Sequence, residues 1–478
     1  MTVAAAQPTH PWLIQGGMGI AVSGWRLAST VARAGQLGVV SGTGIDNVFV
    51  RRLQDEGADE DLRRVLGHFP VPRLVDEVLS RFATVRRRPR EPYRTLPMLT
   101  HDSPATSWDV LVLAAFAEVA MAKAGHGGLV GINLLTKVQL PTAATLFGAV
   151  LAGVDYVIMG AGVPTHIPGL LARLSRGEAV EEPLTVATAT GERTDSVPFD
   201  PAPYAPAAPL TTPRFIAVVS SHVLATALAR RSNGPVHGFV VERPSAGGHN
   251  APPRGRMEID EHGNPVYGER DRIDLDALGE LGRPYWIAGG ITTREQVRDV
   301  IDQGATGVQV GTLFAYCRES GMSAALRERI LAALTRAPLE VRTSTTASST
   351  GYPFKVVVAP DTVADESVYH SRRRHCDLGY LREAYELPDG TIGYRCAAEP
   401  VASYLRKGGE RACTVGTTCL CNGLMATAGL GQFRSGGRQE PPIVTSGDAL
   451  DQVVTLLAGR SSYGALDVME HLRPDAVQ

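Results

Sequence analysis

The chain has 478 residues, of which 44% are hydrophobic and 20% are charged, and its formal net charge is −2. This balance excludes the broad basic surface of a nucleic-acid-binding protein, and six cysteines in so long a chain argue against a disulfide scaffold. We read no apolar run as long enough to span a bilayer, and residues 1–8 lack the basic start and apolar core of a signal peptide. We therefore expect a cytoplasmic protein with no membrane partner.

Eight short apolar segments, each followed closely by glycine or another small residue, predict eight strands. In chain order they cover residues 12–15, 37–40, 129–135, 156–159, 215–219, 238–242, 285–288 and 307–310. Helical patterns between them imply parallel crossovers, and eight is the number that closes a (β/α)₈ barrel. An open doubly wound sheet is the competing fold, but no G-x-G-x-x-G with a later acidic residue follows an early strand. We predict an α/β protein of the TIM-barrel class, built from residues 10–45 and 127–335.

Three further segments do not fit a minimal barrel. Residues 46–126, rich in Arg and Pro, form a large insertion after strand two, expected to fold as helices and a loop covering the barrel mouth. Residues 177–213 are expected to be an insertion or a surface hairpin. Residues 336–478 are expected to be a C-terminal helical extension that acts as a lid. The run Arg86–Arg90 is either a solvated charge run or a grip for an anionic carrier.

The segment after the sixth strand carries the strongest chemical signal. Ala246-Gly247-Gly248-His249 follows Glu242. Paired glycines let a backbone pass close to a flat ligand, because no Cβ stands in the way. A histidine beyond them can exchange a proton near neutral pH. The alternative is an ordinary glycine turn followed by an exposed histidine.

The last two strands predict a phosphate site. Gly289 and Gly290 follow strand seven, and Gly311 and Thr312 follow strand eight. Barrels frequently bind phosphate between these two loops, through backbone N–H groups that glycine leaves accessible. The alternative is that tight turns use glycine whatever they bind.

Taken in order, these pieces resemble the nitronate monooxygenase family, once called 2-nitropropane dioxygenases, which are FMN-dependent barrels. The matching segments are 15–18, 131–133, 246–249, 288–290 and 307–312, within a match over about residues 10–320. The same barrel is shared by flavin-dependent enoyl reductases of fatty acid synthesis, including trans-acting reductases of polyketide and polyunsaturated fatty acid assembly lines.

The resemblance implies that FMN lies across the barrel mouth. The cofactor-binding residues that it implies are Gly16, Gly17, Met18, Asn133, Gly247, Gly248, Gly289, Gly290, Gln309, Gly311 and Thr312. His249 would face the reactive side of the ring. In the monooxygenases the matching histidine is taken as the base for the carbon-bound proton; in the reductases it orients or protonates the substrate carbonyl.

The resemblance predicts an FMN-dependent oxidoreductase that oxidises a small nitronate-like carbanion with O₂, with His249 as base. The first alternative is an enoyl reductase that uses NAD(P)H and FMN and takes its substrate as a thioester of coenzyme A or an acyl carrier protein. The second is a barrel that binds flavin without catalysis. Thr43, Ser220 and Arg254 are candidate substrate contacts. A homodimer is the default expectation.

Five of the six cysteines fall in the C-terminal segment, at positions 376, 396, 413, 419 and 421. Zinc or an iron–sulfur cluster is one interpretation of so many thiols. The C-x-C spacing is tight and the other gaps are long and irregular, so we favour buried or reactive free thiols and predict no metal. Cys419–Leu424 resembles the opening of a buried helix that packs against the barrel.

Overall fold

The computed structural model describes residues 10–204 and 210–474, and its centre is one eight-stranded parallel sheet. The strands are β1 (Leu13–Gln15), β2 (Gly38–Ser41), β3 (Val130–Leu135), β4 (Tyr156–Gly160), β7 (Arg214–Val219), β8 (Gly238–Glu242), β9 (Tyr285–Ala288) and β10 (Gly307–Val310). Their order is β1-β10-β9-β8-β7-β4-β3-β2. A parallel bridge between Ile14 and Leu37 brings the two outer strands together. The predicted TIM barrel is confirmed, with all eight strands at the expected places.

The strands are buried on both faces, and alternate residues serve different sides. One set, including Ile158, Val240 and Trp286, packs with its counterparts from the other strands into a cluster of its own inside the barrel. The other set, including Val157 and Val241, joins the large cluster shared with the surrounding helices. Burial on both faces explains why these segments read as continuous apolar runs rather than as alternating patterns.

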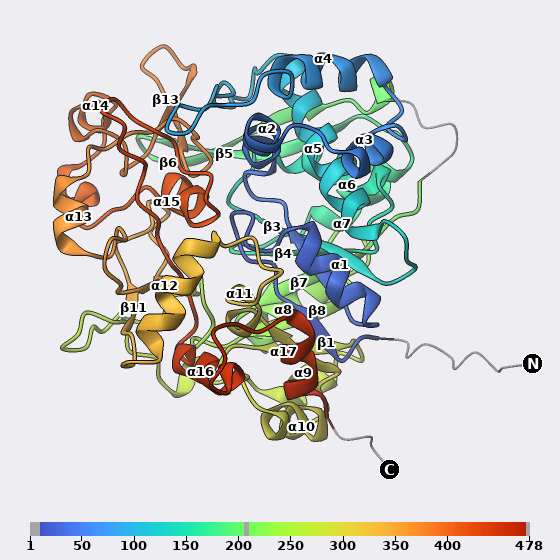
Figure 1. Ribbon diagram of the computed structural model, residues 1–478, viewed down its shortest axis with the longest axis vertical. Helices are drawn as coiled ribbons and strands as arrows, with labels where there is room; N and C mark the ends of the chain where they lie inside the picture. Colours follow the sequence, from blue (N-terminus) through green and yellow to red (C-terminus); the bar gives the residue numbers. More distant parts are fainter. Residues whose placement is uncertain (1–9, 205–209, 475–478) are drawn as a thin grey trace, which may run out of the picture.

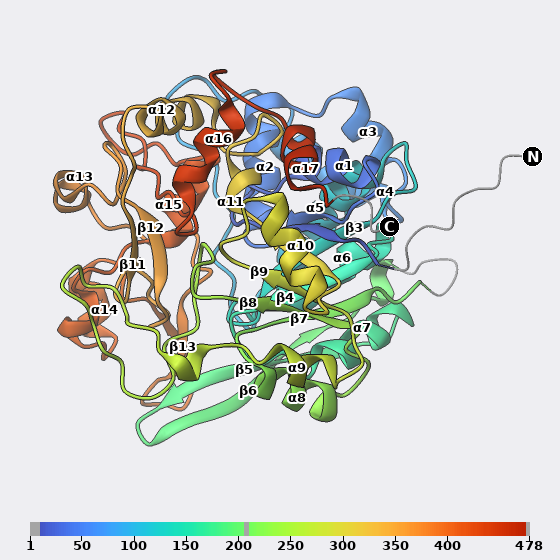
Figure 2. The ribbon, with the colours of Figure 1, turned by 90° about the horizontal axis from the view of Figure 1, so that it is seen from below.

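Helices surround the barrel (Figures 1 and 2). Those between its strands are α1 (Trp25–Arg33), α2 (Ile45–Glu56), α3 (Glu60–Leu66), α4 (Pro72–Phe82), α5 (Ala105–Lys123), α6 (Thr142–Leu151), α7 (Ile167–Ser175), α8 (His222–Arg231), α9 (Leu275–Gly279) and α10 (Arg294–Asp302). After β10 come α11 (Thr312–Ala315) and α12 (Ala324–Leu334).

Helix α5 corrects one expectation from the sequence. Its 19 residues are long and apolar enough, by length and composition, to cross a membrane, whereas we read no run of that length. In the fold α5 is the crossover helix between β2 and β3, and it packs against α1, α2, α3 and α6. Its high hydropathy is accounted for by this burial on several sides.

The rest of the insertion at 46–126 divides into two parts. Helices α2, α3 and α4 lie beside α5 on the flank of the barrel (Figure 1). The loop between α4 and α5 runs toward the C-terminal extension, where the Tyr93 backbone N–H donates to Gln432 and Arg382 donates to the carbonyl of Leu99.

The segment between α7 and β7 contains a long antiparallel hairpin, β5 (Val180–Thr188) and β6 (Gly191–Phe199), which projects from one side of the molecule in Figure 2. A hairpin is one of the two forms expected there. A second hairpin, β13 (Glu383–Glu386) with β14 (Ile392–Arg395), adds to it and gives the sheet order β14-β13-β5-β6.

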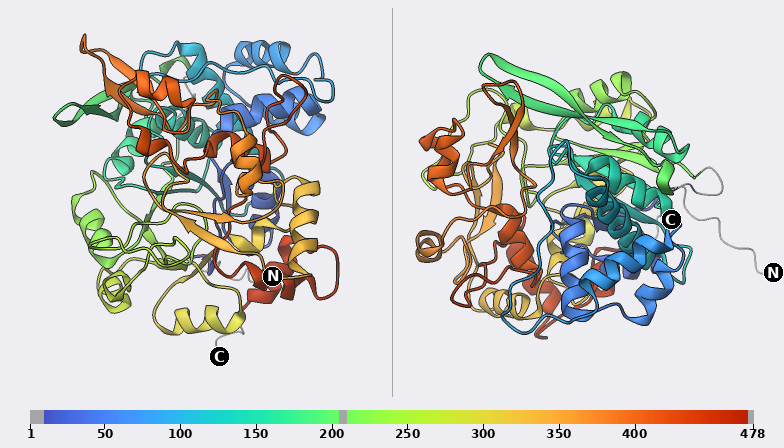
Figure 3. Two further views of the ribbon diagram at one scale, coloured as in Figure 1. Left: turned by 90° about the vertical axis from the view of Figure 1, so that its left-hand side faces the viewer. Right: turned by 90° about the horizontal axis from the view of Figure 1, so that it is seen from above.

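The C-terminal extension is less helical than expected, because it also contains β11 (Val341–Ser344), β12 (Phe354–Val357) and the β13–β14 hairpin. Its helices are short: α13 (Glu366–Ser371), α14 (Val401–Arg406), α15 (Leu420–Thr427), α16 (Val453–Leu457) and α17 (Ala465–Leu472). Single 3₁₀ turns occur at Ala202–Tyr204, Glu269–Asp271, Arg411–Thr414 and Leu450–Gln452. Most of the extension stands on one side of the barrel (Figures 1 and 3), and α17 returns to pack on α1 and α10.

Candidate functional site

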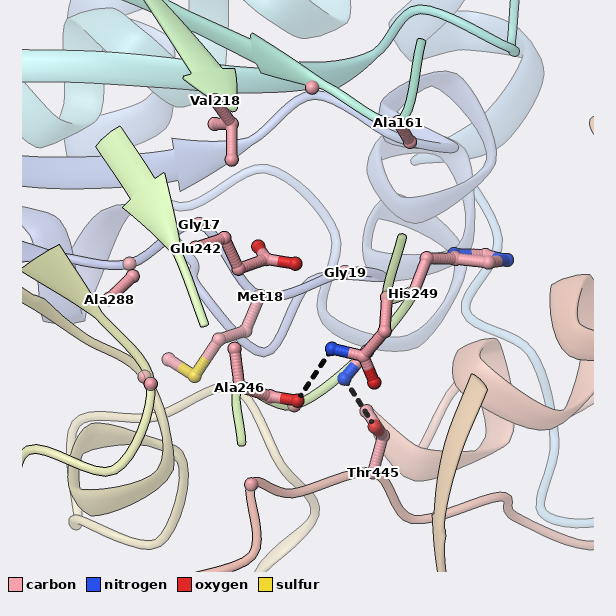
Figure 4. Close-up of a pocket in the computed structure, with 18 of the residues that line it drawn as sticks. Gly17, Met18, Gly19, Ala161, Val218, Glu242, Ala246, His249, Ala288 and Thr445 are labelled. Carbon is pink, nitrogen blue, oxygen red and sulfur yellow. Dashed lines mark hydrogen bonds between the residues drawn. The ribbon is translucent and has the colours of Figure 1, made fainter. Parts of the chain in front are cut away.

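A cavity of about 480 Å³ lies at the carboxyl ends of the strands and is lined by residues from the ends of all eight. Figure 4 shows part of its wall. All eleven glycine, Met, Asn, Gln and Thr residues expected to bind the cofactor line this cavity, together with His249, Thr43 and Ser220. Active sites of barrels collect at this end, so the structure places nearly every predicted site residue in one chamber.

Arg254 is the exception among the predicted contacts, because it is not among the residues that line the cavity. Its side chain is exposed and reaches back to the carbonyl of Ser220 at 3.4 Å. Its backbone N–H donates to Asp271. The structure therefore shows an exposed arginine outside the cavity lining, and not the predicted substrate contact.

Glycine is required at several points of the wall. A Cβ on Gly17 would lie 2.2 Å from Cβ of Asn133. Gly289 and Gly290 have φ angles of +95° and +75°, which other residues adopt only with strain. A Cβ on Gly247 would lie 2.8 Å from the backbone carbon of Ser446. The turns therefore bring bare backbone to the cavity, as a flat or phosphorylated ligand requires.

The end of the cavity near β9 and β10 is completed by the C-terminal extension. The backbone N–H of Gly447 donates to Oγ1 of Thr312 at 2.9 Å, and the hydroxyls of Ser446 and Tyr316 are 2.7 Å apart. The N–H of Gly248 donates to Oγ1 of Thr445 at 2.9 Å. These residues were not predicted from the sequence, although the run Thr445-Ser446-Gly447 combines hydroxyls with a glycine, which is a signal for a binding turn.

Two amides contribute polar atoms to the wall. Nδ2 of Asn133 donates to the carbonyl of Ile158 at 3.1 Å, which fixes its direction. Nδ2 of Asn250 donates to the carbonyl of Ala246 at 3.1 Å. Oδ1 of Asn250 is buried and has no partner among the described residues. A buried acceptor without a partner costs free energy, so Asn250 is a candidate to receive a ligand hydrogen bond.

His249 sits between the barrel and the extension. Its Nε2 lies 2.8 Å from Oγ of Ser348, and its ring meets Phe354 edge-on at 4.8 Å between centroids. Burial, and then the charge of Lys137, lower its pKa to about 3. The imidazole is therefore neutral at pH 7, which differs from the expected titration near neutral pH. In Figure 4 the ring extends away from Glu242 and Met18.

Two other titratable groups near the cavity have shifted pKa values. Glu242 ends β8 and points into the chamber (Figure 4), and burial raises its pKa to about 8. Burial lowers the pKa of Lys137 to about 7, and this ammonium lies over the ring of Tyr352 and 3.5 Å from Oγ1 of Thr350. Groups shifted in this way cluster at functional sites. From the sequence, Glu242 was expected only as the residue that leads into the Ala246–His249 motif, and Lys137 was not predicted.

The outer wall of the cavity is apolar and comes mainly from the extension. It includes Tyr352, Phe354, Tyr380, Leu381, Leu420 and Leu424. Tyr380 is held by two buried partners from the barrel side: its hydroxyl donates to Asp46 and accepts from Nδ2 of Asn47 at 2.7 Å. The extension therefore forms a fixed cover over this part of the strand ends.

Comparison with known proteins gives one family and several partial likenesses. Residues 176–368 match the family model described as nitronate monooxygenase. A nitronate monooxygenase of Pseudomonas aeruginosa is 35% identical over 113 residues, which cover 23% of this chain and 29% of that relative. The chain thus spans less than a third of the length of this relative.

Among solved structures, FabK from Thermotoga maritima is 14% identical, with 97% of this chain and 91% of that one covered and a TM-score of 0.47. A nitroalkane oxidase from Streptomyces ansochromogenes is 15% identical, with 96% and 94% covered and a TM-score of 0.47. The family match and the curated relative confirm the resemblance seen in the sequence: residues 176–368 are similar to the nitronate monooxygenase family.

Proposed function

We propose that the protein is an FMN-dependent oxidoreductase of the nitronate monooxygenase type, which oxidises a small carbanion-like substrate with O₂. The observation that carries the proposal is the glycine-walled cavity at the strand ends, with His249 on its rim. The match of residues 176–368 to the nitronate monooxygenase model supports it.

The residues of the cavity fit FMN. Gly17 and the Gly289–Gly290 turn leave no room for side chains and expose backbone to the chamber. Thr312 offers a hydroxyl at the end where the last two strands close, the usual phosphate position in barrels. The unpaired Oδ1 of Asn250 offers an acceptor to a ring N–H. When bound, the flavin would supply two-electron chemistry that no side chain provides.

The chain's own residues would manage protons. His249, neutral at pH 7, has a lone pair that can accept a proton, although a pKa of about 3 makes it a weaker base than a free imidazole. The nearby side chain of Lys137, whose pKa is lowered to about 7, would in its protonated form stabilise a substrate anion. Glu242 with its pKa near 8 would stay protonated and donate a hydrogen bond. The apolar cover from the extension would exclude water from these groups.

An enoyl reductase that uses NAD(P)H is the second candidate, and the apolar wall favours it. Leu381, Leu420 and Leu424 give the cavity a side suited to an acyl chain. Such a substrate would be held as a thioester of coenzyme A or an acyl carrier protein. Arg86, Arg88 and Arg90 are exposed and free to face an anionic carrier, whereas Arg87 is bound to Asp55 at 2.8 Å.

Anaerobic mixing of the purified protein distinguishes these functions. A flavin absorbance spectrum that is bleached by a nitronate alone supports the monooxygenase. Bleaching only by NADPH, followed by reoxidation with an enoyl thioester, supports the reductase. Absence of flavin after gentle purification and after addition of FMN would refute both functions. Bound flavin that neither nitronate nor NADPH reduces would instead support a barrel that binds flavin without catalysis.

His249→Ala tests the role of the histidine, with His262→Ala as its control, because His262 is an exposed histidine further along the loop after β8. We expect His249→Ala to lose turnover by about 10²–10⁴-fold while it retains flavin. His262→Ala should behave as wild type. Turnover that survives in His249→Ala would show that another group handles the proton.

A further inference from the structure

Four cysteine side chains that are far apart in the sequence line one small void in the extension. This thiol pocket is formed by Cys376, Cys396, Cys419 and Cys421. Cys396, Cys419 and Cys421 are buried, and Cys376 is partly buried. Each of these four thiols lies close enough to at least one of the others for their charges to interact. The remaining cysteines lie elsewhere: Cys413 is exposed, and Cys317 is buried in the barrel.

Side chains next to the cysteines hold the three segments together. Asp377, which follows Cys376, accepts from Nδ2 of Asn422 at 2.8 Å, and Asn422 follows Cys421. Arg374 donates to the carbonyl of Ala397 at 3.0 Å, beside Cys396, and to that of Thr414 at 2.7 Å. Hydrogen bonds therefore connect each cysteine-bearing segment to another one, and these bonds fix the positions of the segments around the pocket.

The size of the void limits what it can hold. Its volume is about 10 Å³, roughly that of a single water-sized sphere. A single ion fits this space, whereas an iron–sulfur cluster with several iron and sulfide atoms does not. Four cysteine thiolates form one of the ligand sets of structural zinc, which they bind in a tetrahedron with Zn–S bonds of about 2.3 Å.

We propose that the thiol pocket binds one thiophilic divalent cation, best matched by Zn²⁺, through Cys376, Cys396, Cys419 and Cys421. No three His, Cys, Asp or Glu side chains in residues 10–204 and 210–474 are spaced for metal ligation as they stand. Binding therefore requires the four cysteine side chains to turn until their sulfurs close on the ion.

The ion would have a structural role in the cover of the large cavity. Leu381, Leu420 and Cys421 line both the thiol pocket and the large cavity, so they form the wall between them. Around them the extension has only short helices and strands. Segments with so little regular structure gain stability from a metal that crosslinks them. The proposal does not depend on which reaction the protein catalyses.

Metal analysis of the full-length holoprotein tests the proposal. We expect about one zinc per chain after dialysis against a mild chelator, and loss of that zinc in Cys419→Ser. The control is Cys413→Ser, which removes an exposed thiol of the same extension and should retain zinc. Replacement of zinc by Co²⁺ should give the intense sulfur-to-metal absorption of a tetrathiolate site.

A second measurement on the wild type covers the case in which Cys419→Ser fails to fold. An organomercurial reagent is added stepwise to modify the thiols, and a chelator that changes colour with zinc measures the zinc released. We expect the exposed Cys413 to react first without release of zinc, and the reaction of the pocket thiols to release the ion. Protein with no zinc and six free thiols would overturn the proposal. So would a mass about 2 Da low, from a disulfide, or iron with acid-labile sulfide.

Discussion

The half-buried carboxyl of Glu242, which faces the cavity, makes the stability of the flavin-free protein depend on pH in a way that one substitution removes. Burial raises its pKa from the usual 4.5 to about 8, so the folded state binds the proton more tightly than the unfolded chain. The contribution of this group to the free energy of unfolding is full below pH 4.5 and is lost as pH rises to about 8. Glu242→Gln keeps the shape and removes the titration.

The magnitude follows from the size of the pKa change. Each pH unit between the two values is worth about 1.4 kcal/mol, so the loss from pH 5 to pH 8 is at most about 4 kcal/mol. The carboxyl faces the cavity, where water screens it, and we expect about 2 kcal/mol. His249 and Lys137, with lowered pKa values, contribute opposite slopes below pH 6.5 and above about pH 7 respectively. They are common to wild type and variant and cancel in the difference.

Urea unfolding followed by tryptophan fluorescence at pH 5, 6, 7 and 8 measures this difference. The stability of Glu242→Gln relative to wild type should rise by about 2 kcal/mol across the series. Glu181→Gln is the control, because Glu181 is an exposed carboxyl on the β5–β6 hairpin; its curves should run parallel to those of wild type. Parallel curves for Glu242→Gln as well would refute a protonated Glu242 at neutral pH.

Three further predictions concern the cavity wall and the hydrogen-bond partner of His249. Gly247→Ala places a Cβ 2.8 Å from the backbone of the extension and should weaken FMN binding, measured by fluorescence titration. Gly248→Ala is the matched control: its Cβ meets nothing within 4 Å, and it should cost only the strain of φ +84°, about 1–2 kcal/mol of stability. Thr312→Val leaves a backbone N–H without its acceptor and should lower the free energy of unfolding by about 1–3 kcal/mol, while Thr312→Ser should restore it. Ser348→Ala removes the 2.8 Å partner of His249 and should lower kcat with little change in flavin content; an unchanged kcat would mean that Ser348 does not position the ring.

The barrel was predictable because its signals are local. Each strand is a short apolar run ended by a glycine or small residue, and the parallel order follows from the helices between the strands. The floor of the site follows from the barrel, since residues at the carboxyl ends of the strands must meet there. Gly17, Asn133 and Thr312 could therefore be placed together before any coordinates.

The cover of the site could not be predicted in this way. The contact of Gly447 with Thr312 joins residues 135 positions apart, and that of Thr445 with Gly248 joins residues 197 apart. No periodicity or turn chemistry encodes such pairs. The same holds for the thiol pocket: the spacing of its cysteines along the chain looks irregular, yet three separate segments bring them to one void.

The chemistry of His249 shows why these distant contacts matter for function. A histidine after two glycines is expected to titrate near pH 6.5, and the barrel alone would leave it at an open rim. Ser348 and Phe354, about 100 residues later, pack against it. Burial, and then the charge of Lys137, lower its pKa to about 3. The barrel thus supplies the imidazole, and the extension contributes to the burial that keeps it neutral. A truncation that removed the extension would therefore change the proton chemistry of the site as well as its access to water.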